Sequence, residues 1–212
     1  MRFVNLRWLL SAAMVASSFA APRPHTVALG HWRTVRVTDQ VGRYERAKVR
    51  PLFIDGRLRE YTSGVLHEVT NQTFVIRRAR RINDSLPDEI GQRPRWVWQL
   101  DSWLSVDRLT GHITQLRLPE FDPDSSRINW YRDYAAYCGS SDDGSRSYMV
   151  IFQLGARKPI LKKEFSGPLC APPQWQRDPA RVTFEAGGEK NKFLVRSRNA
   201  ELEPQTDKGA GP

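Results

Sequence analysis

The sequence predicts an all-β fold in which antiparallel hairpins form a partial β-propeller-like or β-sandwich domain. Apolar residues never recur at helical spacing for three turns, and 132–137 is expected to form a single helical turn at most. Short runs of β-branched and aromatic residues instead alternate with turn-forming dipeptides. One run, 148–154, is apolar on both sides, which is typical of a strand between packed layers.

Paired turn residues mark the expected hairpins. Asp55 and Gly56 are the clearest case, because a two-residue hairpin turn favours residues that adopt positive φ. Further turns are expected at Thr70 and Asn71, Leu100 and Asp101, Thr110 and Gly111, and Gly187 and Gly188. The loops between these runs are predicted at 83–95, 119–132 and 167–180, the last of which contains four prolines.

The doubly apolar run needs cover on both faces. Alternate residues of a strand point to opposite sides. Here the two sets are Tyr148, Val150, Phe152 and Leu154 on one side, and Met149 and Ile151 on the other. A sheet with one solvated face would place polar residues in one of these sets, so we expect this strand to lie between two layers.

The chain begins with the features of a signal peptide over 1–21. Arg2 and Arg7 precede an apolar run over 8–16, and small residues around Ala20 supply a cleavage site. A membrane-spanning helix needs about 20 apolar residues, roughly twice this run. We therefore expect a protein of the periplasm or secreted medium, with no transmembrane segment after cleavage.

The remaining chain, about 190 residues, suits a single β-rich domain over 26–198. The segment 199–212 has little to bury and is expected to be a disordered tail. Cys138 and Cys170 both survive cleavage of the leader. Two cysteines in an exported protein most simply form one structural disulfide.

The balance of charges is strongly basic. Loss of the two leader arginines lowers the formal charge from +10 to +8. Such a balance favours anionic partners, although a high arginine content also aids solubility. The expected partner is an acidic polysaccharide or a protein, and no specific nucleic acid is expected.

Two local patterns resemble known proteins. "VDRLTGHITQL" (106–116) and "SDDGSRSYMVIF" (141–152) are similar to β-propeller repeats of the TolB type, in which a D-x-x-T-G hairpin precedes an S-x-D-G turn into the next blade. The resemblance covers about residues 102–163 and implies sheets stacked face to face; four or more blades are needed to close such a ring. "WYRDYAAYCG" and "RKPILKK" also resemble segments of uncharacterised exported all-β proteins of bacteria, which implies no particular activity.

An aromatic cluster is the first candidate binding site. Trp130, Tyr131 and Arg132 follow one another, and Asp122 lies shortly before them. Flat aromatic faces stack on sugar rings or bases, and arginine pairs with carboxylate or phosphate. The alternative is that the aromatic residues pack under a loop as part of the core.

A basic run in 73–83 is the second candidate. Arg77 and Arg81 share one face of the expected strand, and Arg78 and Arg80 share the other. The strand is therefore expected to protrude or to lie at an edge, where charge also protects against aggregation. Together with the basic segment 155–163, these residues indicate a footprint for an acidic partner.

Catalytic chemistry is weakly indicated. No metal-ligand spacing or phosphate-binding glycine loop occurs, and neither a metal ion nor a cofactor is expected. Asp122 and Asp124 are a carboxylate pair of the kind that hydrolases use, but this pattern also forms turns. We expect an exported binding or interaction module for an acidic envelope polymer, glycan or partner protein. The alternatives are a scaffold subunit of an envelope assembly or a carboxylate-dependent hydrolase.

Overall fold

A computed structural model describes residues 24–38, 43–85, 94–167, 170–197 and 199–203. These ranges contain fifteen strands and no helix, which confirms the all-β prediction. In the same part of the chain no helix is long and apolar enough to cross a membrane. The predicted signal peptide, 1–21, lies outside the described residues.

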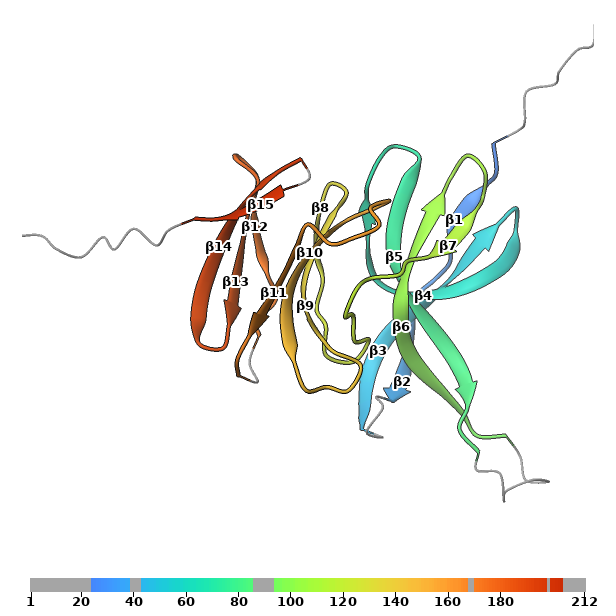
Figure 1. The fold of residues 1–212 in the computed structure, drawn as a ribbon. Helices are drawn as coiled ribbons and strands as arrows, with labels where there is room; N and C mark the ends of the chain where they lie inside the picture. The colour runs from blue at the N-terminus through green and yellow to red at the C-terminus, as the bar shows by residue number, and fades with distance from the viewer. Residues whose placement is uncertain (1–23, 39–42, 86–93, 168–169, 198, 204–212) are drawn as a thin grey trace, which may run out of the picture.

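The first sheet contains seven strands, which occupy the right side of Figure 1. Five of them, β2 to β6, form a closed ring of pairings, in which β2 and β6 are parallel and the other neighbours antiparallel. β1 pairs with β3, and β7 pairs with β6. The strands are β1 (Val27–Leu29), β2 (Arg33–Thr38), β3 (Tyr44–Ile54), β4 (Arg57–Glu68), β5 (Thr73–Asn83), β6 (Trp96–Asp107) and β7 (Ile113–Gln115).

Most predicted hairpin turns are present. Asp55 and Gly56 connect β3 to β4 with φ values of 51° and 73°, the conformation that a two-residue turn requires. The predicted turns at 70–71 and 110–111 also lie between paired strands. The prediction of a turn at Leu100 and Asp101 is wrong, because both residues lie within β6. The pairing of β5 with β6 shifts register between Arg77 and Ala79, and Asp101 and Ser102 of β6 lie at this irregularity.

Two four-stranded antiparallel sheets follow in sequence and lie beside each other in Figure 1. The middle sheet has the order β11-β10-β9-β8, and the last sheet has the order β12-β13-β14-β15. The predicted hairpin at Gly187 and Gly188 joins β13 to β14. The strands are β8 (Asn129–Tyr131), β9 (Tyr134–Ser140), β10 (Ser147–Gln153), β11 (Leu161–Phe165), β12 (Gln174–Gln176), β13 (Arg181–Ala186), β14 (Glu189–Arg196) and β15 (Asn199–Leu202).

The doubly apolar strand is β10, and both of its faces are covered. Residues 148–152 are all buried, with exposed fractions between 0% and 7%. Met149 and Ile151 pack against the last sheet, in a cluster that includes Phe184 and Phe193. Val150 and Phe152 pack on the other side against apolar residues of the 116–128 linker, which follows the first sheet. The prediction of a strand between two layers is therefore confirmed.

The linker approaches the middle sheet most closely at Gly139. The Ser140 amide donates a hydrogen bond to the Glu120 carbonyl oxygen at 2.9 Å. A Cβ atom at position 139 would lie 2.0 Å from that oxygen, a separation that a side chain cannot occupy. Only glycine permits this contact.

We therefore expect Gly139→Ala to lower the free energy of unfolding by about 1–3 kcal/mol, the usual cost of an overpacked site. Urea unfolding followed by circular dichroism measures the change. Thr114→Ala, an exposed position in β7, serves as the control and should stay within about 0.5 kcal/mol of the parent. An unchanged midpoint for Gly139→Ala would mean that the linker moves away at no cost.

Two local predictions need correction. Residues 199–202 form β15 instead of a disordered tail, because their backbone pairs with β14 and Ala200 packs against the core between the last two sheets. Residues 132–133 form a tight turn, with Arg132 at a φ of 52°, and β9 follows directly in place of a helical turn. The rest of the expected tail, 204–212, lies outside the described residues.

The predicted disulfide is present between Cys138 and Cys170, with a Cα–Cα distance of 6.4 Å. It attaches β9 to the proline-rich segment that precedes β12. Cys170 also forms an isolated bridge with Ala186 at the end of β13. The disulfide therefore joins the middle and last sheets beside their shared core.

Candidate functional site

A groove of about 560 Å³ lies where the three sheets approach one another. We call it the junction groove. It is lined by the end of β4, by β8 with the turn after it, and by β12 with the residue after it. The lining residues are His67, Glu68, Val69, Asn129, Trp130, Tyr131, Arg132, Gln174, Trp175 and Arg177. Three predicted binding residues, Trp130, Tyr131 and Arg132, therefore converge on one concave surface.

Two aromatic rings of the groove are held in place by hydrogen bonds to the backbone. The rings of Tyr131 and Trp175 lie 5.4 Å apart with an interplanar angle of 32°. The Trp175 Nε1–H donates to the Asn129 carbonyl oxygen at 2.9 Å, and the Tyr131 hydroxyl donates to the Arg177 carbonyl oxygen at 3.2 Å. Rings with fixed orientation lose little conformational entropy when a ligand stacks on them.

Trp130 belongs to the packing between sheets. Its ring contacts Trp103 of β6 edge to face at 5.3 Å and stacks on His67 at 5.9 Å and 18°. The His67 Nε2–H donates to the Arg132 carbonyl oxygen at 2.7 Å, which connects β4 to the turn after β8. Trp130 therefore packs mainly against other residues of the protein, as the alternative interpretation predicts, although it also lines the groove.

The charged groups of the groove leave it positive. Arg132 lies with its guanidinium 5.3 Å from the centre of the Tyr131 ring, and Arg177, two residues after Trp175, is exposed. Within the described residues, neither guanidinium has a carboxylate partner. Glu68 is already bound by Arg108 through two contacts of 2.6 and 2.7 Å, and this hydrogen bonding lowers the pKa of Glu68.

Asp122 lies outside the junction groove, and its carboxylate stabilises the turn that it begins. Its carboxylate accepts hydrogen bonds from the Asp124 amide at 2.9 Å and from the Ser125 hydroxyl at 2.5 Å. Its carbonyl oxygen accepts another from the Ser126 amide at 2.9 Å. These contacts are those of a turn-forming aspartate. Asp124 instead lines a separate hollow of about 100 Å³ between the linker and β2.

Arg77 is half-buried in the interface between β5 and the linker. Its guanidinium donates to the carbonyl oxygen of Pro123 and, at 3.4 Å, to that of Asp101. Burial is the main cause that lowers the pKa of Arg77 to about 10. The expectation that this side chain contributes to an outward basic footprint is therefore wrong. Alternation places Arg77 on the face of Val75, and that face is covered, since Val75 is fully buried.

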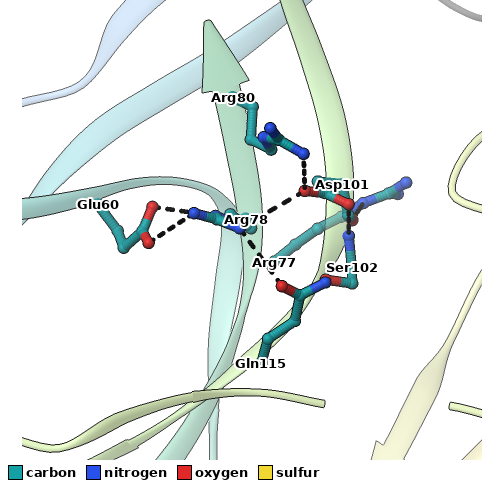
Figure 2. Close-up of polar contacts among 7 residues, drawn as sticks. All are labelled: Glu60, Arg77, Arg78, Arg80, Asp101, Ser102 and Gln115. Carbon is teal, nitrogen blue, oxygen red and sulfur yellow. Dashed lines mark hydrogen bonds and ion pairs between the residues drawn. The ribbon is translucent and has the colours of Figure 1, made fainter. Parts of the chain in front are cut away.

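The other arginines of β5 are mostly neutralised inside the same sheet (Figure 2). Arg78 binds both carboxylate oxygens of Glu60 at 2.7 and 3.0 Å and lies 3.7 Å from Asp101. Arg80 lies 3.4 Å from the same Asp101 carboxylate. Arg81 is exposed and lies over the Trp96 ring at 5.2 Å. The four arginines therefore do not act together as one free cationic surface.

The position of β5 explains this outcome. Up to Ala79 the strand lies in the interior of the sheet, between β4 and β6. Beyond Ala79 it pairs only with β6, and this two-stranded part projects from the sheet in Figure 1. The prediction of a protruding strand therefore holds for 80–83 alone.

Seven of the ten lining residues were not predicted from the sequence, among them His67, Trp175 and Arg177. His67 comes from the end of β4, and Trp175 and Arg177 come from β12 and the residue after it; all are far from 130–132 in the sequence. The only local signal was an aromatic residue two positions before an arginine in the proline-rich segment 167–180. Their convergence depends on the pairing of the strands, which sequence spacing does not specify.

Comparison of the chain with protein-family models, with curated proteins and with solved structures finds no match. The described residues contain no group of three or more His, Cys, Asp or Glu side chains that could hold a metal ion. The site is therefore interpreted from its own geometry and charge.

Proposed function

We propose that this protein is an exported binding module that holds an acidic polysaccharide in the junction groove. The observation that carries the proposal is the fixed pair of Tyr131 and Trp175 beside two guanidinium groups without carboxylate partners in the described structure. Export is the prediction from the leader sequence, and the disulfide is compatible with an oxidising compartment.

The chemistry of the groove matches a sugar that carries a carboxylate. The apolar face of a sugar ring stacks on tyrosine or tryptophan, and a guanidinium binds a carboxylate through two parallel hydrogen bonds. The amide of Gln174 adds a donor and an acceptor for hydroxyl groups. Arg132 follows β8 and Arg177 follows β12, so the groove offers two cations to an acidic chain.

The alternatives receive less support from the same contacts. A scaffold role was based on β10 needing cover from another subunit, but the chain itself covers both faces of β10. The far face of the last sheet carries charged residues such as Glu185 and Lys190, which form an ion pair in solvent. A hydrolase based on Asp122 lacks support, because that carboxylate is occupied within its own turn.

The test uses oligogalacturonate, a chain of carboxylated sugars, and its methyl ester, which has the same rings without the charge. We expect saturable binding of oligogalacturonate by isothermal titration calorimetry, with an affinity that falls as salt is added. Tyr131→Ala should weaken binding of both ligands by at least about tenfold, because it removes a stacking surface. Arg132→Asn should weaken the charged ligand alone, and asparagine tolerates the positive φ at this position.

Arg196→Ala, an exposed substitution in β14, is the matched control and should leave both affinities unchanged. Equal losses for Arg196→Ala and Arg132→Asn would indicate a nonspecific charge effect and would contradict the proposal. Absence of saturable binding to either oligosaccharide would reject a glycan ligand of this class and favour a protein partner.

A further inference from the structure

The antiparallel ribbon of β2 and β3 carries a row of cations that only the strand register reveals. Arg36 lies directly opposite Arg46, and Thr34 lies opposite Lys48. Because residues two apart on a strand share a face, Arg36, Arg46 and Lys48 all project from the same side of the ribbon. All three side chains are exposed. We call this side the cationic ribbon face.

Among the described residues, nothing neutralises these cations. No ion pair or side-chain hydrogen bond is formed by any of the three in the structure as described, whereas Arg78 and Arg108 of the same sheet both bind carboxylates. Directly opposite residues have Cβ atoms only about 4.5–5.5 Å apart, and like charges in that position destabilise a sheet. An arrangement that opposes folding and has no counter-charge in the described part of the chain points to an anion outside the protein.

Aromatic side chains lie at both ends of the row. Tyr44, two residues before Arg46 on β3, is 62% exposed. At the other end Trp32 is 44% exposed, and its ring lies 4.2 Å from the guanidinium carbon of Arg50. The part of β3 from Tyr44 to Arg50 spans about 20 Å at the usual rise per residue. Trp and Tyr flanking a group of cations are typical of surfaces that meet lipid headgroups.

We infer that the cationic ribbon face is a docking surface for an anionic lipid bilayer. Charge complementarity with phosphate headgroups carries the inference, since arginine binds phosphate through paired donors and basic residues near an anionic bilayer strengthen binding. Trp32 and Tyr44 then reach the headgroup region at the two ends of the face. None of the residues of this face lines the junction groove, so the two sites are separate and the inference goes beyond the proposed function.

Sedimentation with lipid vesicles tests the inference. The protein is exported from a bacterial host, and loss of residues 1–21 is checked by mass spectrometry so that the apolar leader contributes no binding. Vesicles of phosphatidylglycerol and phosphatidylcholine are compared with vesicles of phosphatidylcholine alone. We expect salt-sensitive binding to the anionic vesicles only. Equal binding to both kinds of vesicle, or binding to neither, would overturn the inference.

A charge reversal that weakens vesicle binding without lowering stability makes the test specific. Arg46→Glu should weaken vesicle binding by at least about tenfold, because it removes one cation and adds an anion to the face. The same substitution should leave the thermal midpoint unchanged or raise it, because the new carboxylate faces Arg36 across the ribbon. A protein that is more stable and yet binds less lipid cannot be explained by misfolding. Arg36→Gln is the second variant and should also weaken binding.

Two controls separate this face from the rest of the molecule. Arg196→Glu changes the net charge by the same amount on the last sheet and should alter vesicle binding by no more than about twofold. Tyr131→Ala in the junction groove should leave vesicle binding intact. If Arg196→Glu weakens binding as much as Arg46→Glu, net charge alone accounts for the association. If soluble polyphosphate binds in an Arg46-dependent way and anionic vesicles do not, the face binds phosphate but not a membrane, and the inference fails.

Discussion

Ile151→Ala and Phe152→Ala are both expected to destabilise the protein strongly, although these neighbouring side chains point in opposite directions. Ile151 faces the last sheet and is fully buried, and Phe152 faces the linker with 7% of its surface exposed. Truncating a buried isoleucine costs about 2–5 kcal/mol, and truncating a buried phenylalanine costs about 3–5 kcal/mol. In a sheet with one solvated face, only one of two consecutive residues would show such a loss.

Urea unfolding monitored by far-ultraviolet circular dichroism measures both changes, with Thr114→Ala as the exposed control. The two sides of β10 differ in what covers them, so the comparison is informative. Ile151 contacts a regular sheet, whereas the cluster that contains Phe152 is covered mainly by the 116–128 linker, which contains no strand, together with Trp130 and Ala156. A loss below about 1 kcal/mol for Phe152→Ala would mean that the linker relaxes into the space, and the packed-layer description would then hold for one face only.

The fold was predictable where a local pattern had one physical explanation. Two apolar faces in 148–152 require two covers, and Asp55 with Gly56 allows a tight hairpin turn, so both predictions were confirmed. The turn at Leu100 and Asp101 failed because a polar residue in the middle of a strand has two explanations. Asp101 does not end β6; it faces Arg78 and Arg80 of β5 within the sheet. A single sequence does not reveal that partner in advance.

The candidate sites also depend on contacts between distant residues that a single sequence does not reveal. Tyr131 and Arg132 were found because aromatic residues and arginine are adjacent in the chain, but Trp175 reaches them through the pairing of β12 with β13 and the packing between sheets. Arg77 was expected to contribute to an outward basic footprint, but it shares the covered face of Val75 and donates to the carbonyl oxygen of Pro123. Arg36 and Arg46 are ten positions apart, and only the register of β2 and β3 places them opposite each other.

Removal of the disulfide by the paired substitutions Cys138→Ser and Cys170→Ser is expected to lower the free energy of unfolding by about 3–4 kcal/mol. The bond closes a loop with a sequence separation of 32 residues, and the loss of that constraint on the unfolded chain gives this magnitude. Chemical unfolding with and without a reducing agent provides the measurement. Reductant should destabilise the parent protein and leave the serine variant unaffected, which separates loss of the bond from a packing effect of serine.

The same substitution should also weaken the junction groove, because the disulfide holds the segment that leads into β12. Trp175 lies five residues after Cys170, and β12 pairs with only one neighbour, β13, in the last sheet. Without the bond to β9, the orientation of Trp175 toward Tyr131 depends on three hydrogen bonds with β8. They run from Trp175 to the Asn129 carbonyl oxygen, from Asn129 to the Pro173 carbonyl oxygen, and from Tyr131 to the Arg177 carbonyl oxygen. We therefore expect oligogalacturonate affinity to fall under conditions in which the serine variant is still folded. Unchanged affinity in that variant would show that these three hydrogen bonds are sufficient to position the aromatic pair.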